Sequence, residues 1–316
     1  MATAEMGDTR PVLMLTGGAG LVGRNLQAHP GSAAWRVLAP SSADLDLRDP
    51  AATAAWLDRH RPDAVVHAAG VVGGIHANMA EPARFLAANT LIGVNLVTAC
   101  RAAGVGTLIN LGSSCIYPRD LGEGLTEDRI LTGPLEPTNE GYALAKITTL
   151  RLCEYMRRED PTLHYKTLIP CNLFGKWDSF DPARSHLVPA ILVKLDHARR
   201  SGSDTVEIWG NGAARREFMD AADLADAIFR ALDDPAVLPD LMNIGPGQDH
   251  SINDYYRIAA EVVGWHGRFT HDLTRPVGMR RKLLDVTRQR AWGWMPPTPL
   301  AEALRATYAH YRKENP

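Results

Sequence analysis

This chain of 316 residues has no large excess of positive or negative charge. Its 34 lysine and arginine residues nearly balance its 36 aspartate and glutamate residues, which gives a net charge of −2. A balanced surface offers no electrostatic basis for binding nucleic acid or an anionic membrane, so neither is expected as a partner. Basic pairs such as Arg199-Arg200 are short, as in an ordinary solvated surface.

Cysteine is also sparse, and long apolar runs are missing. Four cysteines occur, at Cys100, Cys115, Cys153 and Cys171. They have neither metal-ligand spacing nor the density of a disulfide scaffold, so we expect free thiols and no metal site. No unbroken apolar run approaches the ~20 residues of a membrane span. The segment before Arg10 carries Glu5 and Asp8 instead of the apolar core of a signal peptide, so the chain is expected to be cytoplasmic.

A glycine-rich turn follows the first apolar segment. The strand predicted at Val12–Leu15 runs into Thr16-Gly17-Gly18-Ala19-Gly20-Leu21-Val22-Gly23, where a helical stretch opens. Such glycines let the turn tighten, let the backbone approach a pyrophosphate, and let the helix pack on the strand. The phosphates then face the helix N-terminus. The pattern predicts a dinucleotide site formed by Gly17, Gly20, Leu21, Val22 and Gly23.

The second predicted strand, Arg36–Ala39, ends without an acid. Folds that select NAD usually place a carboxylate there to bind the ribose 2′-OH. This chain has Ser41 and Ser42 instead, which leaves room for a 2′-phosphate and favours NADP(H). Arg24 and Arg36 are candidate phosphate ligands, and a plain Pro-Ser turn is the alternative.

The next segment, Asp44–Pro50, predicts the third strand and the start of a helix. A carboxylate here would hydrogen-bond the adenine amino group, so Asp46 and Leu47 are expected beside the cofactor. Asp49 is equally well explained as a helix cap.

Strands continue to alternate with helices. The buried strand Ala64–Ala69 ends in small side chains, and Ala68 and Ala69 would let a dinucleotide lie across the sheet. Helical stretches follow around Pro82–Cys100 and Thr138–Glu159. This alternation predicts an α/β fold with a Rossmann-type doubly wound parallel sheet.

The apolar strand Leu108–Leu111 ends in Gly112, two serines and a thiol. Ligands bind outside the carboxyl ends of strands in open α/β sheets, so Leu111, Ser113, Ser114 and Cys115 are expected at the site. The alternative is that the serines merely end the strand and that Cys115 is a small buried hydrophobe.

A tyrosine and a lysine four residues apart, Tyr142 and Lys146, share one face of the second helical stretch. A free tyrosine has a pKa near ~10. A lysine ammonium one turn away stabilises the phenolate and would lower that pKa. The pair could then exchange a proton with a carbonyl or alcohol while a hydride moves.

Together with the glycine-rich turn, these residues resemble the extended short-chain dehydrogenase/reductase family over nearly the whole chain. The resemblance implies that Ser113 hydrogen-bonds the substrate oxygen and that Tyr142 is the general acid/base. Lys146 would also hold the nicotinamide ribose. Asn89 either helps to position this network or faces solvent from its helix.

A finer resemblance, to the nucleotide-sugar epimerase/reductases of that family, rests on GSSCIYP, VGGI, LEPTNEGYALAK, SHLVPA, EIWGNG, RREF and RKLLDVTR. It implies NADPH-dependent 3,5-epimerisation and 4-reduction of a GDP-4-keto-6-deoxy sugar, giving GDP-L-fucose or a close relative. It also implies a homodimer in which the helices around Pro82–Cys100 and Thr138–Glu159 pair across a two-fold axis.

This resemblance gives roles to Cys115 and His186. A ketone at C4 acidifies the hydrogens on C3 and C5, so inverting those carbons needs a base on one face of the sugar and an acid on the other. Cys115 would be the base and His186 the acid, with His186 also beside the cofactor. A thiolate is a competent base where positive charge lowers its pKa, and the cofactor, Lys146 and His186 are the candidates. A structural role is the alternative for His186.

The predicted division of the chain is a Rossmann domain at 1–173, with a return at 212–238, and a smaller α/β substrate-binding domain in the remainder of 174–316. Pro170, Asn172 and Leu173 are expected to line the cofactor where the chain leaves the first domain. The resemblance implies sugar-nucleotide contacts from Ser114, Asn172, Lys194, Trp209 and Arg216. Core packing is the alternative for Trp209.

Three places depart from the family pattern. Lys176-Trp177 replaces Pro-His, Lys194 replaces arginine, and Val277 replaces an aspartate associated with substrate. All three fall on the substrate side, so a 4-keto reductase for another nucleotide sugar, such as a GDP-heptose, is the second candidate. A catalytically silent NADP-binding protein is the third, although such proteins commonly lose the Tyr-Lys pair that this chain keeps.

Overall fold

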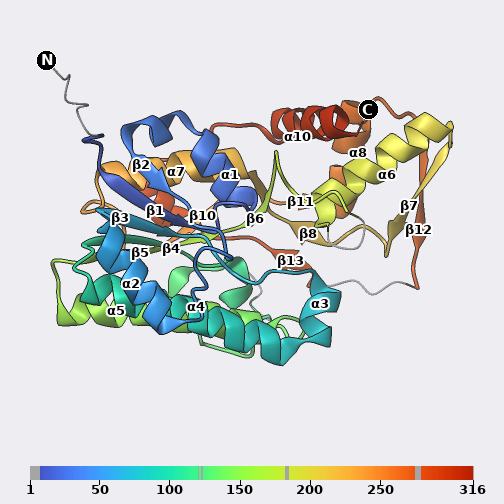
Figure 1. Ribbon diagram of the computed structural model, residues 1–316. Helices are drawn as coiled ribbons and strands as arrows, with labels where there is room; N and C mark the ends of the chain where they lie inside the picture. The colour runs from blue at the N-terminus through green and yellow to red at the C-terminus, as the bar shows by residue number, and fades with distance from the viewer. Residues whose placement is uncertain (1–7, 120, 122–123, 182–184, 275–278, 316) are drawn as a thin grey trace, which may run out of the picture.

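A six-stranded parallel sheet forms the centre of the computed structural model, which describes residues 8–119, 121, 124–181, 185–274 and 279–315 (Figure 1). Its strands are β1 (Val12–Thr16), β2 (Arg36–Leu38), β3 (Ala64–His67), β4 (Thr107–Leu111), β5 (His164–Pro170) and β10 (Leu241–Ile244). The order across the sheet is β2-β1-β3-β4-β5-β10. The chain leaves β1 toward β2 on one side and returns to β3 on the other, so the switch point lies between β1 and β3.

The predicted strand within Asp44–Pro50 is wrong. Residues 42–44 and 47–48 form turns and none of 41–49 is a strand, because the acids bond locally instead of leaving the backbone free for a ladder. Asp46 Oδ1 accepts a hydrogen bond from the Arg48 N–H at 2.9 Å. Asp49 caps helix α2 (Pro50–His60) by accepting from two backbone N–H groups, so the capping alternative is confirmed.

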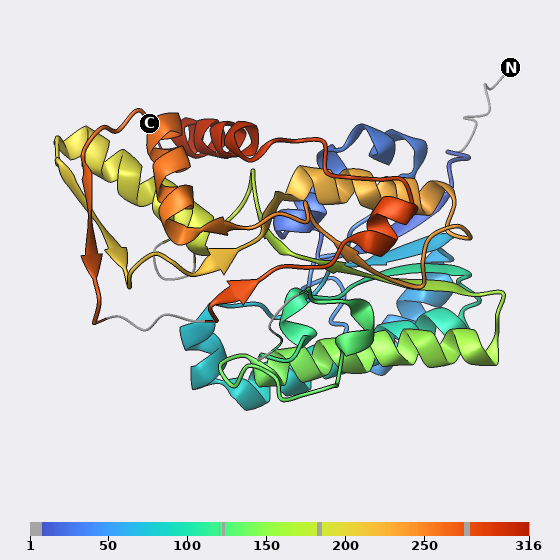
Figure 2. The same cartoon turned by 180° about the vertical axis from the view of Figure 1, so that it is seen from behind.

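Helices cover both faces of the sheet (Figures 1 and 2). Helices α1 (Leu21–Ala28) and α7 (Ala221–Asp233) pack together on one face. Helix α2 packs against α4 (Pro82–Ala102), which packs against α5 (Glu140–Glu159), on the other. The buried strands supply both cores by alternation: Leu13 and Leu15 face one core and Met14 faces the other.

Helix α4 is long and apolar enough to cross a membrane, by length and composition alone. It is the only such helix among the described residues, and half of its apolar window is buried. It lies along α5 and α2, and Leu96 and Val97 are fully enclosed in the core between α4 and the sheet. These contacts are those of a core helix that covers a sheet.

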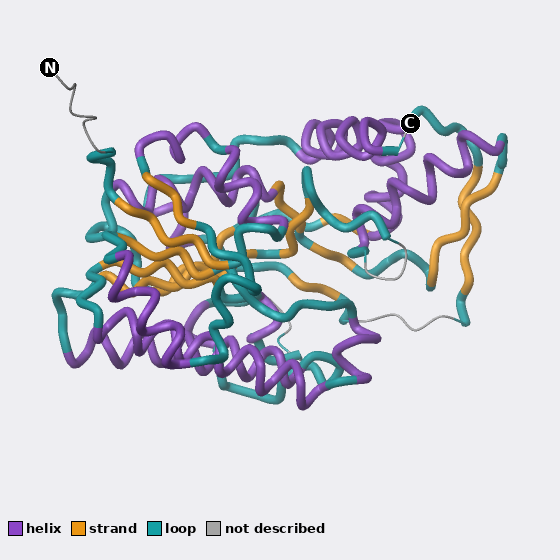
Figure 3. Tube along the Cα trace, in the orientation of Figure 1, coloured by secondary structure: helices purple, strands orange, loops and turns teal. Residues whose placement is uncertain are grey.

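A second, smaller assembly lies beyond the carboxyl end of the sheet, at the right of Figure 1. Its helices are α6 (Leu187–Ser201), α8 (Ile252–Val263) and α10 (Leu300–Glu314), which enclose a core of their own. Its short strands are β6 (Asn172–Phe174), β7 (Thr205–Trp209), β8 (Arg215–Arg216), β9 (Phe218–Asp220), β11 (His250–Ser251), β12 (Arg268–Asp272) and β13 (Arg281–Lys282). They form the sheets β6-β9, β7-β12 and β11-β8-β13, and the β7-β12 pair stands apart in Figure 3.

Short helices complete the chain. Helix α3 (Ile75–Ala80) leads into α4, and α9 (Thr287–Ala291) packs against β10. The 3-10 turns are η1 (Pro30–Ala34), η2 (Ser114–Ile116) and η3 (Glu127–Arg129). Helix α7 and strand β10 return the chain to the Rossmann sheet after the smaller assembly has begun.

Candidate active site

The glycine-rich turn lies at the switch point of the sheet, and Gly17 and Gly23 have no room for a side chain. Gly17 has a φ of 74°, and a Cβ there would lie 2.7 Å from the Ala68 carbonyl oxygen after β3. A Cβ on Gly23 would overlap the Gly17 carbonyl. The turn therefore approaches β3 through backbone alone, which is the surface that a pyrophosphate requires.

The N-terminus of α1 is open above this turn. Gly20 is its N-cap, with no side-chain hydrogen bond to the first turn, so the N–H groups at Leu21 and Val22 face outward from the helix end. Behind the turn, Thr16 Oγ1 accepts from the Ala69 N–H at 3.1 Å. This cradle fits a dinucleotide diphosphate.

The segment after β2 differs from the expectation of hydroxyls alone. Ser41 donates from its Oγ to Asp44 Oδ2 at 2.6 Å, and its N–H bonds the same oxygen. Ser42 is exposed. Asp46 is paired with Arg48, whose hydrogen bonds lower the Asp46 pKa to about 2, and the backbone carbonyl of Leu47 accepts from a side chain of α4. The hydroxyl of Ser41 is thus bonded to a nearby acid, Asp44, which lies three residues further along the chain.

Strand β4 delivers two hydroxyls and a thiol to the carboxyl edge. Ser113 caps the short turn η2, and its Oγ accepts from the Cys115 N–H at 3.4 Å. Ser114 and Cys115 are 4% and 7% exposed. All three follow β4, whose last residue, Leu111, is buried beside them.

Helix α5 brings Tyr142 and Lys146 to the same place. Lys146 is buried, and its Nζ donates to the Leu111 carbonyl at 2.9 Å and lies 5.8 Å from the centre of the Tyr142 ring. Burial lowers the pKa of Lys146 to about 8, opposed by the Cys115 thiol. Burial and the same thiol raise the pKa of Tyr142. The expected lowering of the tyrosine pKa is therefore wrong for the chain alone, because desolvation of the phenolate dominates.

Cys115 is likewise held as a thiol in the chain alone. Burial raises its pKa, while Lys282 of β13, the Ser113 hydroxyl and Lys146 act in the opposite direction. Lys282 stands first among these opposing charges and was missed in the sequence analysis, although it belongs to the RKLLDVTR motif. Only the folded structure shows that Lys282 lies near this site, because β13 pairs with β8 and places Lys282 opposite Arg216.

His186 occupies the N-cap of α6, at the edge of the smaller assembly. Its Nδ1 lies 3.8 Å from Oδ1 of Asp178. The neighbouring Asp178 carboxylate raises the pKa of His186, and burial acts in the opposite direction. Among the interactions of the described residues, none joins His186 directly to Cys115.

The residues expected to line the cofactor where the chain leaves the first domain, and those expected on the substrate side, lie in three places. Pro170 ends β5, and Asn172 and Leu173 start β6, where Asn172 Nδ2 donates to the Glu217 carbonyl at 2.8 Å. Lys194 of α6 donates to the Glu207 carbonyl, and burial lowers its pKa. Trp209 is 58% exposed, which argues against the core-packing alternative.

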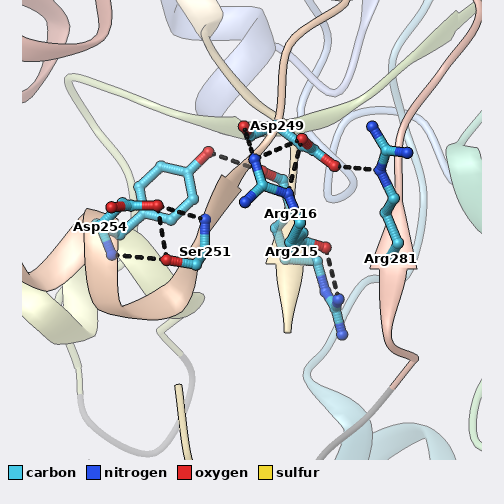
Figure 4. A network of polar contacts seen from close by, with 7 residues as sticks. Arg215, Arg216, Asp249, Ser251, Asp254 and Arg281 are labelled. Carbon is cyan, nitrogen blue, oxygen red and sulfur yellow. Dashed lines mark hydrogen bonds and ion pairs between the residues drawn. The ribbon is translucent and has the colours of Figure 1, made fainter. Parts of the chain in front are cut away.

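Arg216 lies on the central strand of the three-stranded sheet (Figure 4). It donates to the carbonyls of Arg215 and Met279, while Arg215 and Arg281 both bond the buried Asp249. Burial lowers the pKa of Arg216. Figure 4 shows its side chain extending away from the Asp249 pairs, which strand alternation requires.

Asn89 is buried, so the alternative that it faces solvent is wrong. It is 4% exposed and forms two hydrogen bonds with the backbone of Val71 and one with that of Phe85, which pins the loop after β3 to α4. Of the departures, Val277 lies outside the described residues. Trp177 has a φ of 68°, and Lys176 accepts at its carbonyl from Asn25 of α1.

In the part of the chain that the structure describes, no group of three or more His, Cys, Asp or Glu side chains could hold a metal ion. All four cysteines are free and buried.

Comparison with known proteins agrees with this geometry. The model of the NAD dependent epimerase/dehydratase family matches residues 13–245. A GDP-L-fucose synthase from Azorhizobium caulinodans is 52% identical over 299 residues, which cover 95% of this chain and 96% of that protein. A GDP-L-colitose synthase from Yersinia pseudotuberculosis is 48% identical over 302 residues, with 96% and 98% covered.

Solved structures share the fold throughout. A GDP-mannoheptose C4 reductase from Campylobacter jejuni, with NADP bound, superposes with a TM-score of 0.87 at 26% identity, covering 96% of this chain and 99% of that one. The similarity therefore spans both the Rossmann sheet and the smaller assembly.

Proposed function

Because this chain belongs to the NAD-dependent epimerase/dehydratase family, we propose that it is an NADP(H)-dependent enzyme that epimerises and reduces a GDP-4-keto-6-deoxy sugar, giving GDP-L-fucose or a close relative. The observation that carries this proposal is the grouping of Ser113, Cys115, Tyr142 and Lys146 at the carboxyl edge of β4. The glycine cradle at the neighbouring switch point supports the cofactor.

The first proposed task of these residues is reduction. NADPH, when bound, supplies the hydride for C4. Ser113 donates a hydrogen bond to the C4 oxygen, and Tyr142 gives that oxygen its proton. The resulting phenolate needs a nearby positive charge, which Lys146 provides from one helical turn away. The Leu111 carbonyl keeps that ammonium in place.

The second proposed task is epimerisation. Cys115 removes the proton from C3, the electrons pass to the C4 oxygen as an enolate, and His186 delivers a proton to the opposite face of C3. The same exchange at C5 completes the inversion. Each cycle leaves a protonated thiol and a neutral imidazole, which reset by exchange with solvent. The positive charge of Lys282 supports the thiolate form of Cys115.

Deuterium incorporation tests both tasks. Incubation of the 4-keto substrate and NADPH in D2O is expected to place deuterium at C3 and C5 and to consume NADPH. Tyr142→Phe is expected to abolish NADPH consumption, and Cys115→Ser to abolish deuterium incorporation. Reduction without deuterium at either carbon would contradict the epimerase proposal, and NADPH consumption by Tyr142→Phe would contradict the assigned acid.

The second candidate is a reductase for a different nucleotide sugar, with or without epimerisation. It is favoured by the names of the relatives, since a GDP-L-colitose synthase is almost as similar as a GDP-L-fucose synthase, and a GDP-mannoheptose reductase shares the fold. Titration with GDP-linked 4-keto hexoses and heptoses, read as tryptophan fluorescence and then as NADPH consumption, separates the candidates. Turnover of a heptose alone would favour the second.

The chain is further proposed to act as a cytoplasmic homodimer, with a Rossmann domain at 1–173 that includes a return at 212–238 and a mainly substrate-binding remainder. Apolar side chains remain exposed along α4 and α5, at Leu86, Leu91, Leu144 and Tyr155. Pairing of these helices with a second copy would cover them. Sedimentation of Leu91→Glu against the unmodified chain tests this, since an unchanged mass would contradict the pairing.

A further inference from the structure

A buried carboxylate outside the roles assigned above lies against the proposed acid. Asp178 is 4% exposed in its side chain, whereas His186 is 53% exposed. Oδ1 of Asp178 lies 3.8 Å from His186 Nδ1 and accepts from the Ser179 N–H at 2.8 Å. Oδ2 is buried and has no hydrogen-bond partner. An ionised carboxylate costs free energy to bury and is retained where a partner charge compensates it.

The backbone around Asp178 is strained in a way that fixes its position. Trp177 has a φ of 68°, which is a steric outlier for a bulky residue. The Asp178 N–H donates back to the Gly175 carbonyl at 3.3 Å, and the Trp177 ring contacts His310 of α10 edge-on. Strain of this kind persists only where surrounding contacts over-determine it, and it clusters at functional sites.

The position of His186 in the fold disfavours the protonated form of its ring. His186 is the N-cap of α6, where the helix dipole presents positive charge. Without a carboxylate, the neutral ring would be favoured. Of the other described charges in this segment, Lys176 acts on Asp220, and Asp181 is exposed. Among the described residues, Asp178 is the charged group whose effect on the His186 ring is resolved.

We propose that Asp178 is the positioning residue for the acid of the epimerisation: its buried carboxylate holds His186 as an imidazolium, with Nδ1 toward Oδ1 and Nε2 left to exchange its proton with the sugar. This inference rests on the proposed function for the identity of the substrate. Two charged residues would then act on the epimerising pair: Lys282 favours the negative charge of the Cys115 thiolate, and Asp178 favours the positive charge of the His186 imidazolium.

The test begins without substrate. The ring of His186 is titrated by NMR in protein labelled at histidine Cε1, and its resonance is assigned by its loss in His186→Asn. Asp178→Asn keeps the size of the side chain and removes its charge, and it is expected to lower the His186 pKa by about one unit or more. Asp178→Glu is expected to restore most of the shift. Asp181→Asn removes an equal charge from the same segment and is the matched control, with an unchanged His186 titration.

The second readout is deuterium incorporation at C3 and C5 as a function of pH. A drop of one pKa unit lowers the imidazolium fraction about tenfold at high pH. Asp178→Asn should therefore lose about tenfold in exchange at pH 8 and recover toward pH 6, with kcat affected more than KM. A purely structural role would lower exchange equally at every pH and would overturn the inference, as would a His186 titration that Asp178→Asn leaves unchanged. The NMR arm needs no turnover, so a chain that fails to epimerise but shows the Asp178-dependent shift contradicts the proposed reaction and not the Asp178–His186 pair.

Discussion

Glu217 offers a direct test of how burial and hydrogen bonding compete in this fold. It lies between Arg216 and Phe218 and is 1% exposed. Its two oxygens accept from the N–H groups of Gly247 at 2.7 Å and Leu284 at 2.9 Å. Burial raises its pKa from 4.5 to about 7, against those two hydrogen bonds, and Asp249 adds to the rise.

The sign of the pH effect follows from linkage. The pKa in the folded state lies above the unfolded value, so the folded state binds the proton more tightly. The stabilisation is complete below the unfolded pKa and is lost as the pH rises through the folded pKa near 7. A shift of ~2.5 units corresponds to about 3 kcal/mol. Glu217→Gln is always neutral, so its free energy of unfolding should rise relative to the unmodified chain by about 2–3 kcal/mol between pH 5 and pH 8.

Urea denaturation of both chains at a series of pH values measures this difference directly. Asp196→Asn is the contrasting control: Asp196 is 1% exposed, and hydrogen bonds from Tyr308 and Arg199 lower its pKa despite burial. Its stabilisation is present above the unfolded pKa and is lost in acid, so the Asn variant should be most damaging at neutral pH. A Glu217→Gln difference that stays flat with pH would show that the two backbone hydrogen bonds balance burial, and one that falls as the pH rises would show that they outweigh it.

Three further outcomes are expected. In Gly23→Ala, the new Cβ overlaps the Gly17 carbonyl, so NADPH affinity measured by fluorescence titration should fall at least ~tenfold, and near-normal affinity would contradict the tight-turn argument. Lys146→Met leaves the Leu111 carbonyl without its donor, at a cost of about 1–3 kcal/mol in urea, and should slow hydride transfer by about 10²–10⁴ in a single turnover. His67 is 2% exposed, and burial lowers its pKa to about 3, so the unfolded chain binds a proton first as the pH falls. The unmodified chain should therefore lose about 3 kcal/mol relative to His67→Asn between pH 6.5 and pH 4, and equal pH profiles would show that the ring is solvated.

The Rossmann sheet was predictable because its signals are local. The glycine-rich turn, the apolar strands and the alternation with helices each occupy a short window, and the sheet follows from their order. The prediction of a strand within Asp44–Pro50 was wrong for an equally local reason. Its alternating Asp-Leu pattern matches a half-buried strand, but Asp46 and Asp49 satisfy backbone N–H groups in turns and at the cap of α2.

The electrostatics of the candidate site could not be predicted in the same way. The spacing of Tyr142 and Lys146 places them on one face of a helix, but the direction of the tyrosine shift depends on how completely other segments exclude water. Likewise, Lys282 reaches the surroundings of Cys115 because β13 pairs with β8, which no local pattern of residues indicates. Asn89 illustrates the converse case, since a polar residue inside a helix was explained only by the loop that it holds.

The two proposed reactions therefore draw on different parts of the chain. Ser113, Tyr142 and Lys146 are fixed by the end of β4 and by α5, both of which belong to the Rossmann sheet and its cover. His186 and Asp178 belong to the segment between β6 and α6, which joins the smaller assembly. The arrangement of the reducing residues is thus set within the sheet, whereas the arrangement of the epimerising acid depends on how the smaller assembly stands against it. We therefore expect substitutions between residues 175 and 186 to change which sugar carbons are inverted and to leave the hydride transfer to C4 intact. Lys176-Trp177, where this chain departs from the family pattern, lies in this segment.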